Sequence, residues 1–174
     1  MDLSNAQLGR LGETAVAMEL MKRGYDVVNL NDSIKNIQSV DLLCMKGRKR
    51  IFIQVKTGTE HNILTGLTST TNGIIQNVES KIACPWVFVK ATPKGDIDYD
   101  FEFYVLTQEE TLELITTSND WYANQWGRKL KCNILVGVEV KWLCGKGESA
   151  KGQRQAYMNP LKVTSKDKWD KLEF

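Results

Sequence analysis

Three side chains that could do chemistry stand in or beside two short apolar stretches of this chain. Asp41 lies near the start of the first stretch, and Gln54 and Lys56 lie in the second, residues 51–56. Alternate side chains of a strand face the same side, so Gln54 and Lys56 share a face. Burying an unpaired amide and ammonium is costly, and a site shared with Asp41 would explain them. Carboxylate and amide oxygens suit a hard cation such as Mg²⁺.

The two stretches must be brought together by the backbone for such a site to form. Residues 40–45 and 51–56 flank a basic, glycine-bearing turn, a pattern that predicts a β-hairpin. Directly opposed residues of an antiparallel pair share a face. Asp41 can therefore oppose Gln54 or Lys56 only if the turn has an even number of residues.

A predicted helix before this hairpin carries another acidic residue. Ser4 and Gln7 form a capping-box pattern and Gly24 is a stop signal, which together predict a helix over residues 5–23. Its apolar side chains form two stripes at helical spacing, and Glu13 lies within one of them. The stripe predicts that the Glu13 carboxylate faces the protein interior.

These residues resemble the motif of the PD-(D/E)XK nuclease superfamily. That motif has an acid on one strand and, on the next strand, an acid or amide, any residue and a lysine. Here the pattern is Asp41 and the triplet at residues 54–56, and Glu13 matches the superfamily's first-helix glutamate. Val40 replaces the proline of the motif's name, which makes no chemical contribution. Gln54 replaces a second carboxylate, and this glutamine version resembles the Mrr-type restriction endonucleases.

The resemblance covers roughly residues 8–91 and implies a fold as well as an activity. The implied fold is α/β with a restriction-endonuclease-like core, a central mixed β-sheet flanked by helices in the order α-β-β-β-α-β. The implied activity is Mg²⁺-dependent hydrolysis of DNA phosphodiester bonds, with Mn²⁺ as a substitute and DNA favoured over RNA. Many members dimerise, so a homodimer is a further expectation.

The resemblance also assigns roles to individual residues. The implied catalytic residues are Asp41, Gln54, Lys56 and Glu13. The implied metal ligands are the carboxylates of Asp41 and Glu13, the side-chain carbonyl of Gln54 and the backbone carbonyl of Val55. Lys56 would position the attacking water and offset negative charge in the transition state.

Two other classes of function stay open at this point. The chain could be a nucleic-acid-binding or assembly module on the same fold without catalysis, for which Gln54 is the warning sign. Alternatively, Lys56 and Asp41 could form a structural cross-strand ion pair in a protein with an unrelated function.

Composition is consistent with an ordinary globular protein. The chain has 174 residues, 42% hydrophobic and 25% charged, so we expect a single domain over residues 1–174, with a core at about 5–106 and an elaboration over 107–174. No apolar run approaches the length needed to span a bilayer, and the N-terminus lacks the pattern of a signal peptide, which predicts a soluble cytoplasmic protein. Cysteine spacing favours free thiols, and His61 is the single histidine, which argues against histidine-based catalysis.

Basic and acidic residues are unevenly distributed. Residues 1–127 carry 12 basic and 16 acidic side chains, whereas residues 128–174 carry 11 and 5. This excess indicates a footprint for a phosphate backbone in the C-terminal third, although a solvated basic face without a ligand explains it equally well. The candidate DNA contacts are Arg48, Lys49, Lys146, Lys151 and Arg154.

Periodicity and turn signals predict the other elements. Strands are expected over residues 25–30, 86–91, 101–106 and 133–143. Helices are expected over residues 74–83 and 107–116, together with a final helix capped by Ser165 that contains Trp169 and Leu172. The polar segments 57–73 and 145–155 are expected to be loops.

Overall fold

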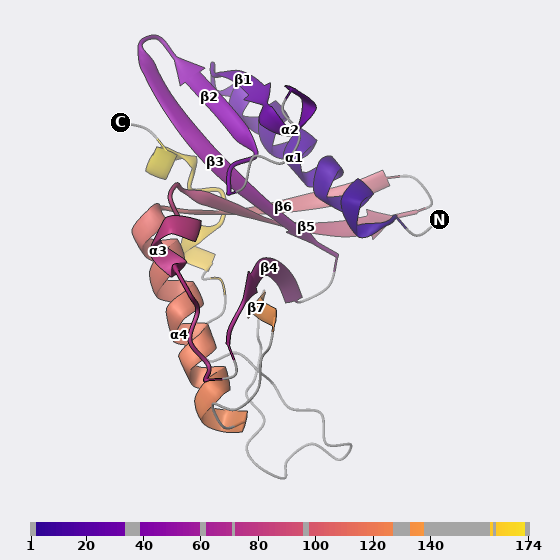
Figure 1. Cartoon of the computed structure of the whole chain (residues 1–174). Helices are drawn as coiled ribbons and strands as arrows, with labels where there is room; N and C mark the ends of the chain where they lie inside the picture. Colours follow the sequence, from indigo (N-terminus) through magenta and orange to yellow (C-terminus); the bar gives the residue numbers. More distant parts are fainter. Residues whose placement is uncertain are drawn as a thin grey trace.

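The computed structural model describes residues 3–33, 39–59, 62–70, 72–95, 98–126, 133–137, 161 and 163–172. Among these residues, five strands form the central sheet: β1 (Asp26–Asn29), β2 (Leu42–Lys46), β3 (Lys49–Gly58), β5 (Trp86–Lys94) and β6 (Asp98–Leu106). Their spatial order is β1-β2-β3-β5-β6 (Figure 1). Neighbours are antiparallel except β3 and β5, which run parallel. The predicted α/β fold with a central mixed sheet flanked by helices is confirmed, and it is compatible with a restriction-endonuclease-like core.

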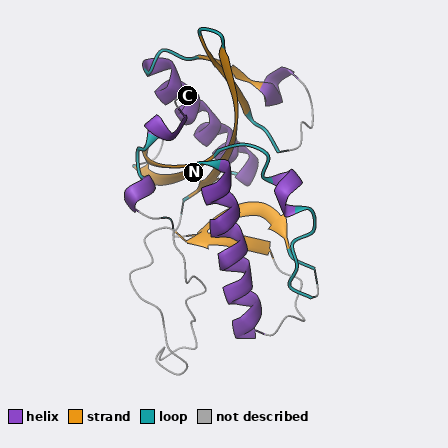
Figure 2. Cartoon of the chain, turned by 90° about the vertical axis from the view of Figure 1, so that its left-hand side faces the viewer, coloured by secondary structure: helices purple, strands orange, loops and turns teal. Residues whose placement is uncertain are grey.

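Helices and a small second sheet cover the central sheet. The described helices are α1 (Asn5–Lys22), α2 (Leu30–Ser33), α3 (Val78–Lys81) and α4 (Gln108–Trp126), with 3-10 helices η1 (Val163–Ser165) and η2 (Trp169–Leu172). The second sheet pairs β4 (Asn62–Thr68) with β7 (Asn133–Gly137). Helix α1 packs on β1 and β3, whereas α4 packs on β6 and β7 (Figures 1 and 2).

Two apolar clusters follow from strand alternation in the central sheet. Ile53 and Val87 face α1 and η2, where they pack with Val16 and Trp169. Trp86 and its face of the sheet pack with residues of α4, β4 and β7. The sheet is therefore buried on both faces at its centre, as expected for a mixed sheet with helices on both sides.

The first helix and the hairpin form as the sequence predicts. Ser4 and Gln7 make the capping box that starts α1. The hairpin pairs Lys46 with Lys49, which leaves a two-residue turn. Gly47 in this turn has a φ of 63°, a left-handed conformation that glycine adopts without strain. The predicted even-numbered turn is therefore confirmed.

The prediction of a loop over residues 57–73 is wrong for most of its length. Strand β3 continues to Gly58, and residues 62–68 form β4. Ile63, Thr65 and Leu67 alternate as buried residues, and Thr65 Oγ1 donates to the carbonyl oxygen of Ile134 at 2.9 Å. The buried hydroxyl of Thr65 is thus satisfied by the neighbouring strand, as a buried polar group requires.

Two predicted helices also need correction. Only Val78–Lys81 of the predicted helix 74–83 is helical, because Asn77 has a φ of 53° and interrupts the backbone just before it. The predicted final helix is instead a pair of short 3-10 helices, η1 and η2, separated by Asp167 with a φ of 54°. Trp169 and Leu172 are nevertheless buried, in the cluster beneath α1.

Other elements are longer than predicted or only partly described. Helix α4 continues to Trp126, ten residues beyond the predicted end, although Thr116 to Asp120 are poor helix formers. Tertiary contacts hold this part of the chain, since α4 packs on β7 and the buried Asn119 donates from Nδ2 to the carbonyl oxygen of Gly73 at 2.7 Å. Strands β5 and β6 extend as one long antiparallel pair. Of the predicted strand 133–143, residues 133–137 form β7 and the rest lies outside the described residues, as does the loop 145–155. No helix in the described part of the chain is long and apolar enough to cross a membrane.

Candidate functional site

A cavity of about 410 Å³ opens where the first half of α1, the end of β3 and β4 meet. Glu13, Asp41, Val55 and Lys56 all line it. They come from α1, from the residue just before β2 and from β3, so the fold brings together residues up to 43 positions apart in the sequence. Gln54, the fifth predicted residue, lies buried beside Asp41.

Asp41 is the most enclosed carboxylate of the site, with 8% of the residue exposed. Its Oδ2 accepts hydrogen bonds from the backbone N–H of Val55 at 2.7 Å and from Gln54 Nε2. Its Oδ1 accepts from Asn31 Nδ2 at 3.0 Å. Asp41 lies just before β2, where the N–H of Asp41 donates to the carbonyl oxygen of Ile53 at 2.9 Å, and its side chain reaches Gln54 on the neighbouring strand.

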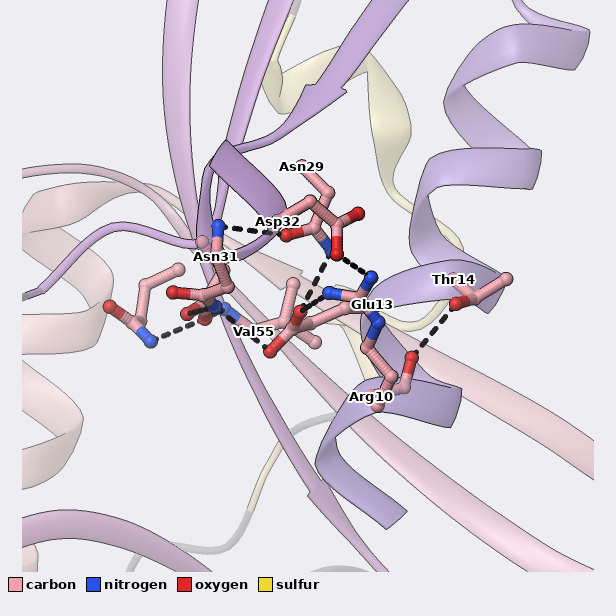
Figure 3. A network of polar contacts seen from close by, with 9 residues as sticks. Arg10, Glu13, Thr14, Asn29, Asn31, Asp32 and Val55 are labelled. Carbon is pink, nitrogen blue, oxygen red and sulfur yellow. Dashed lines mark hydrogen bonds and ion pairs between the residues drawn. The ribbon is translucent and has the colours of Figure 1, made fainter. Parts of the chain in front are cut away.

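Glu13 lies on the opposite side of the same space and is held by two asparagines. Asn29 Nδ2 donates to Glu13 Oε2 at 2.8 Å, and Asn31 Nδ2 donates to Glu13 Oε1 at 3.2 Å (Figure 3). Arg10 lies near the same carboxylate, with 3.7 Å between Arg10 Nη1 and Glu13 Oε2. The Asn31 amide therefore bridges the carboxylates of Glu13 and Asp41.

Lys56 is largely buried, and its ammonium group lies over an aromatic ring. Its Nζ is 5.4 Å from the ring centroid of Trp86, a cation–π contact. Burial lowers the pKa of Lys56, and the negative charges of Asp41 and Glu13 raise it in part. Within the described residues no ion pair joins Lys56 to Asp41, which is evidence against the structural ion-pair interpretation.

Gln54 has an unsatisfied acceptor next to Asp41. It is 4% exposed, its Nε2 donates to Asp41, and its Oε1 is buried without a hydrogen-bond partner. A buried amide oxygen without a partner is unusual and calls for an explanation such as an ion. Val55 touches Asp41 through its N–H group, so the predicted role of its carbonyl as a ligand stays a prediction.

The donor set fits a hard divalent cation. No group of three or more His, Cys, Asp or Glu side chains that could hold a metal occurs among the described residues. The site instead offers two carboxylates joined by one amide, plus the unpartnered oxygen of Gln54. The carboxylate oxygens and the amide oxygen of Gln54 are hard donors. Mg²⁺ is commonly held by one or two carboxylates together with water and substrate phosphate. Asp41, Glu13 and Gln54 would hold it here.

Glycine positions α1 against the site. A Cβ atom on Gly12 would lie 1.8 Å from Thr57 Oγ1, so only glycine allows the helix to approach β3 this closely. The next residue, Glu13, is thereby brought to the end of β3. Gly66 on β4 has a φ of 76°, and a Cβ there would be 3.8 Å from Lys56 Nζ.

The candidate DNA contacts are only partly placed. Arg48 and Lys49 lie exposed at the tip of the β2–β3 hairpin, next to exposed Lys46 and Arg50. The other candidate contacts, Lys146, Lys151 and Arg154, lie outside the described residues. The described chain thus presents basic side chains on the arm that carries Gln54 and Lys56.

The described cysteines have no role in this chemistry. Cys44 and Cys84 are buried free thiols. Burial raises the pKa of Cys44 to about 12 and that of Cys84 to about 11, so both thiols are protonated and poorly nucleophilic at neutral pH. Cys132 and Cys144 lie outside the described residues.

Sequence reasoning missed Asn29 and Asn31. The sequence patterns place Asn29 near the end of a predicted strand and give Asn31 no role, yet the amides of both residues hold the two carboxylates. The signal that could have found them is a pair of asparagines, two positions apart, at the end of the predicted strand that precedes Asp41 in the sequence.

Comparison with known proteins adds no relative. No protein-family model matches the chain, and no curated protein sequence matches it.

Proposed function

We propose that this chain is a Mg²⁺-dependent endonuclease that hydrolyses DNA phosphodiester bonds. The observation that supports this most directly is that Glu13, Asp41 and Lys56 line one cavity although burying charged groups is costly. Asp41 also has the partly unsatisfied Gln54 amide at its side. Such an arrangement is difficult to explain as packing alone.

The chemistry assigned to each residue follows from its position. Asp41 and Glu13 would hold the cation, which when bound neutralises phosphate charge and makes a bound water a stronger nucleophile. Gln54 would add a neutral oxygen. The ammonium of Lys56 would orient the attacking water and stabilise the negative charge that develops on the phosphate. Burial makes this ammonium a stronger acid than that of a surface lysine.

A nucleic acid is the substrate class that the surface near the site favours. Lys46, Arg48, Lys49 and Arg50 are exposed around the hairpin turn. Strand β3 runs from this tip directly to Gln54 and Lys56, so a phosphate backbone bound at the tip can extend to the cavity.

A second candidate is a nucleic-acid-binding module on the same fold without catalysis. It is favoured by the saturation of Asp41, whose two oxygens already accept from Val55, Gln54 and Asn31. Both candidates predict DNA binding, but only the nuclease predicts cleavage.

Incubation of the purified chain with supercoiled plasmid tests the proposal. We expect nicking that requires Mg²⁺ or Mn²⁺, stops with EDTA and is absent in Asp41→Asn, which keeps the side-chain volume but removes the charge. A parallel reaction with RNA tests the preference for DNA. Binding of plasmid without nicking under every metal condition would favour the inactive module.

A further inference from the structure

The amide of Asn31 occupies the space between the two candidate metal-binding carboxylates. Its Nδ2 lies 3.0 Å from Asp41 Oδ1 and 3.2 Å from Glu13 Oε1. Both oxygens therefore accept from the same nitrogen, whose N–H groups direct partial positive charge at the two carboxylates; Figure 3 shows Asn31 beside Glu13. A cation held by both carboxylates would lie beside this amide group, because it is attracted by the same two oxygens.

A cation and an N–H group repel each other, so the amide must change its orientation. The side-chain amide of asparagine is a roughly two-fold rotor, and a half-turn exchanges its nitrogen and its oxygen. After the half-turn, Oδ1 faces the space that Nδ2 faces in this structure. We propose that Asn31 is a further cation ligand, through Oδ1, an inference that rests on the metal-dependent function proposed above.

The backbone of Asn31 is fixed in place for this role. The N–H of Leu30 donates to the carbonyl oxygen of Asp41 at 2.8 Å. The N–H of Asn31 donates to Asn29 Oδ1 at 3.0 Å. These two bonds hold the backbone around Asn31 next to Asp41, so the side-chain amide of Asn31 can turn while its backbone stays at the site.

Gln54 has the same arrangement on the other oxygen of Asp41. Its Nε2 donates to Asp41 Oδ2, while its Oε1 is buried without a partner. Both amides therefore present N–H groups to Asp41, the arrangement that suits a carboxylate without a cation. If both turned, the cation would gain two neutral oxygens. Asn31 would then add one ligand to a site in which Gln54 stands where the motif has a second carboxylate.

Calorimetric titration with Mn²⁺ alone, on the full chain without nucleic acid, tests the role of Asn31. We expect Asn31→Ala to weaken Mn²⁺ binding by about tenfold or more, since removal of even an outer partner at a metal site costs this much. Asn31→Asp presents an oxygen in either orientation and should bind at least as tightly as the wild type. Asn72→Ala, at an exposed turn residue that does not line the cavity, is the matched control and should bind as the wild type does.

The outcomes separate this proposal from the proposed function. If the wild type binds Mn²⁺ and Asn31→Ala binds it equally or more tightly, the Asn31 amide only bridges the carboxylates when no cation is bound. The ligand proposal is then overturned, and the nuclease proposal stands. If the wild type binds no Mn²⁺, with or without DNA, the metal-dependent function fails and the ligand proposal fails with it.

A second measurement covers the case in which Asn31→Ala does not fold. In wild-type protein labelled with ¹³C at the asparagine side-chain carbonyl, Mg²⁺ should shift an asparagine carbonyl band in the infrared difference spectrum. The same band should be missing from the difference spectrum of labelled Asn31→Asp. Mg²⁺ binding without any such shift in the wild type would overturn the proposal.

Discussion

Replacing Gln54 with glutamate changes the charge of the candidate site and leaves the side-chain volume almost unchanged. Gln54 is 4% exposed, and its Nε2 donates to Asp41 Oδ2. The substitution removes this donor and sets a second carboxylate against Asp41. We expect the variant to be less stable than the wild type without a cation and to bind a cation more tightly.

The size of the effect follows from these contacts. Loss of a hydrogen bond to a charged group costs about 1.5–3 kcal/mol. Two negative charges about 4 Å apart repel by about 4 kcal/mol at an effective dielectric constant of about 20, and uptake of a proton by the new carboxylate limits this cost. A net loss of about 2–4 kcal/mol would lower the melting temperature by roughly 4–16 °C in a chain of this size.

Thermal melting in EDTA and in a series of Mn²⁺ concentrations measures both effects. Gln54→Met is the matched control, because it removes the same donor without adding charge and should show no extra stabilisation by Mn²⁺. Mn²⁺ should raise the melting temperature of Gln54→Glu by more than that of the wild type, with plasmid nicking kept or raised. The reasoning is refuted if Gln54→Glu is as stable as Gln54→Met in EDTA, or if Mn²⁺ stabilises it no more than the wild type.

Three further predictions concern the residues around the site. Burial lowers the pKa of Lys56, so Lys56→Met should abolish nicking yet melt at a higher temperature at neutral pH. This gain should shrink as the pH rises above the lowered pKa, where the folded wild type no longer carries the buried charge; a gain that is independent of pH would contradict the argument. Gly12→Ala should cost about 1–3 kcal/mol by overpacking against β3, whereas Gly9→Ala, with open space around it, should stabilise by roughly 0.5–1 kcal/mol in chemical denaturation. Replacing Arg48 and Lys49 with glutamine should reduce the slope of log K against log salt by about 0.9 for each phosphate that is no longer neutralised, and an unchanged slope would place the DNA elsewhere.

Local patterns were sufficient to predict the hairpin and the pairing within it. The two apolar stretches and the basic turn define the strands, and alternation fixes which side chains share a face. The turn is even, and the Asp41 carboxylate indeed accepts from Gln54, although the N–H of Asp41 bonds to Ile53 rather than continuing the strand register. The position of Glu13 was also predictable, because helical spacing places it on an inward-facing stripe and the capping box fixes where α1 begins.

Strand β4 could not be predicted in the same way. Its buried positions include Thr65, and Ser69 follows it directly, so hydroxyl groups give the segment the composition of a loop. Its partner, β7, lies about 70 residues later in the sequence, and the bond from Thr65 to Ile134 exists only once the two strands meet. Propensity is a weak guide where long-range pairing decides the structure.

The pattern of Asp41, Gln54 and Lys56 in the sequence does not predict which groups donate hydrogen bonds to the Asp41 carboxylate. In this structure the carboxylate accepts from two side-chain amides and from the Val55 N–H, and only the amides can turn away. Each hydrogen bond to a charged group is worth about 1.5–3 kcal/mol, and about 1.4 kcal/mol corresponds to a tenfold change in affinity. The energy needed to turn Asn31 and Gln54 therefore weakens the affinity for the cation. Because Gln54 also contributes no charge, the site should need more Mg²⁺ than the same site with a carboxylate at position 54.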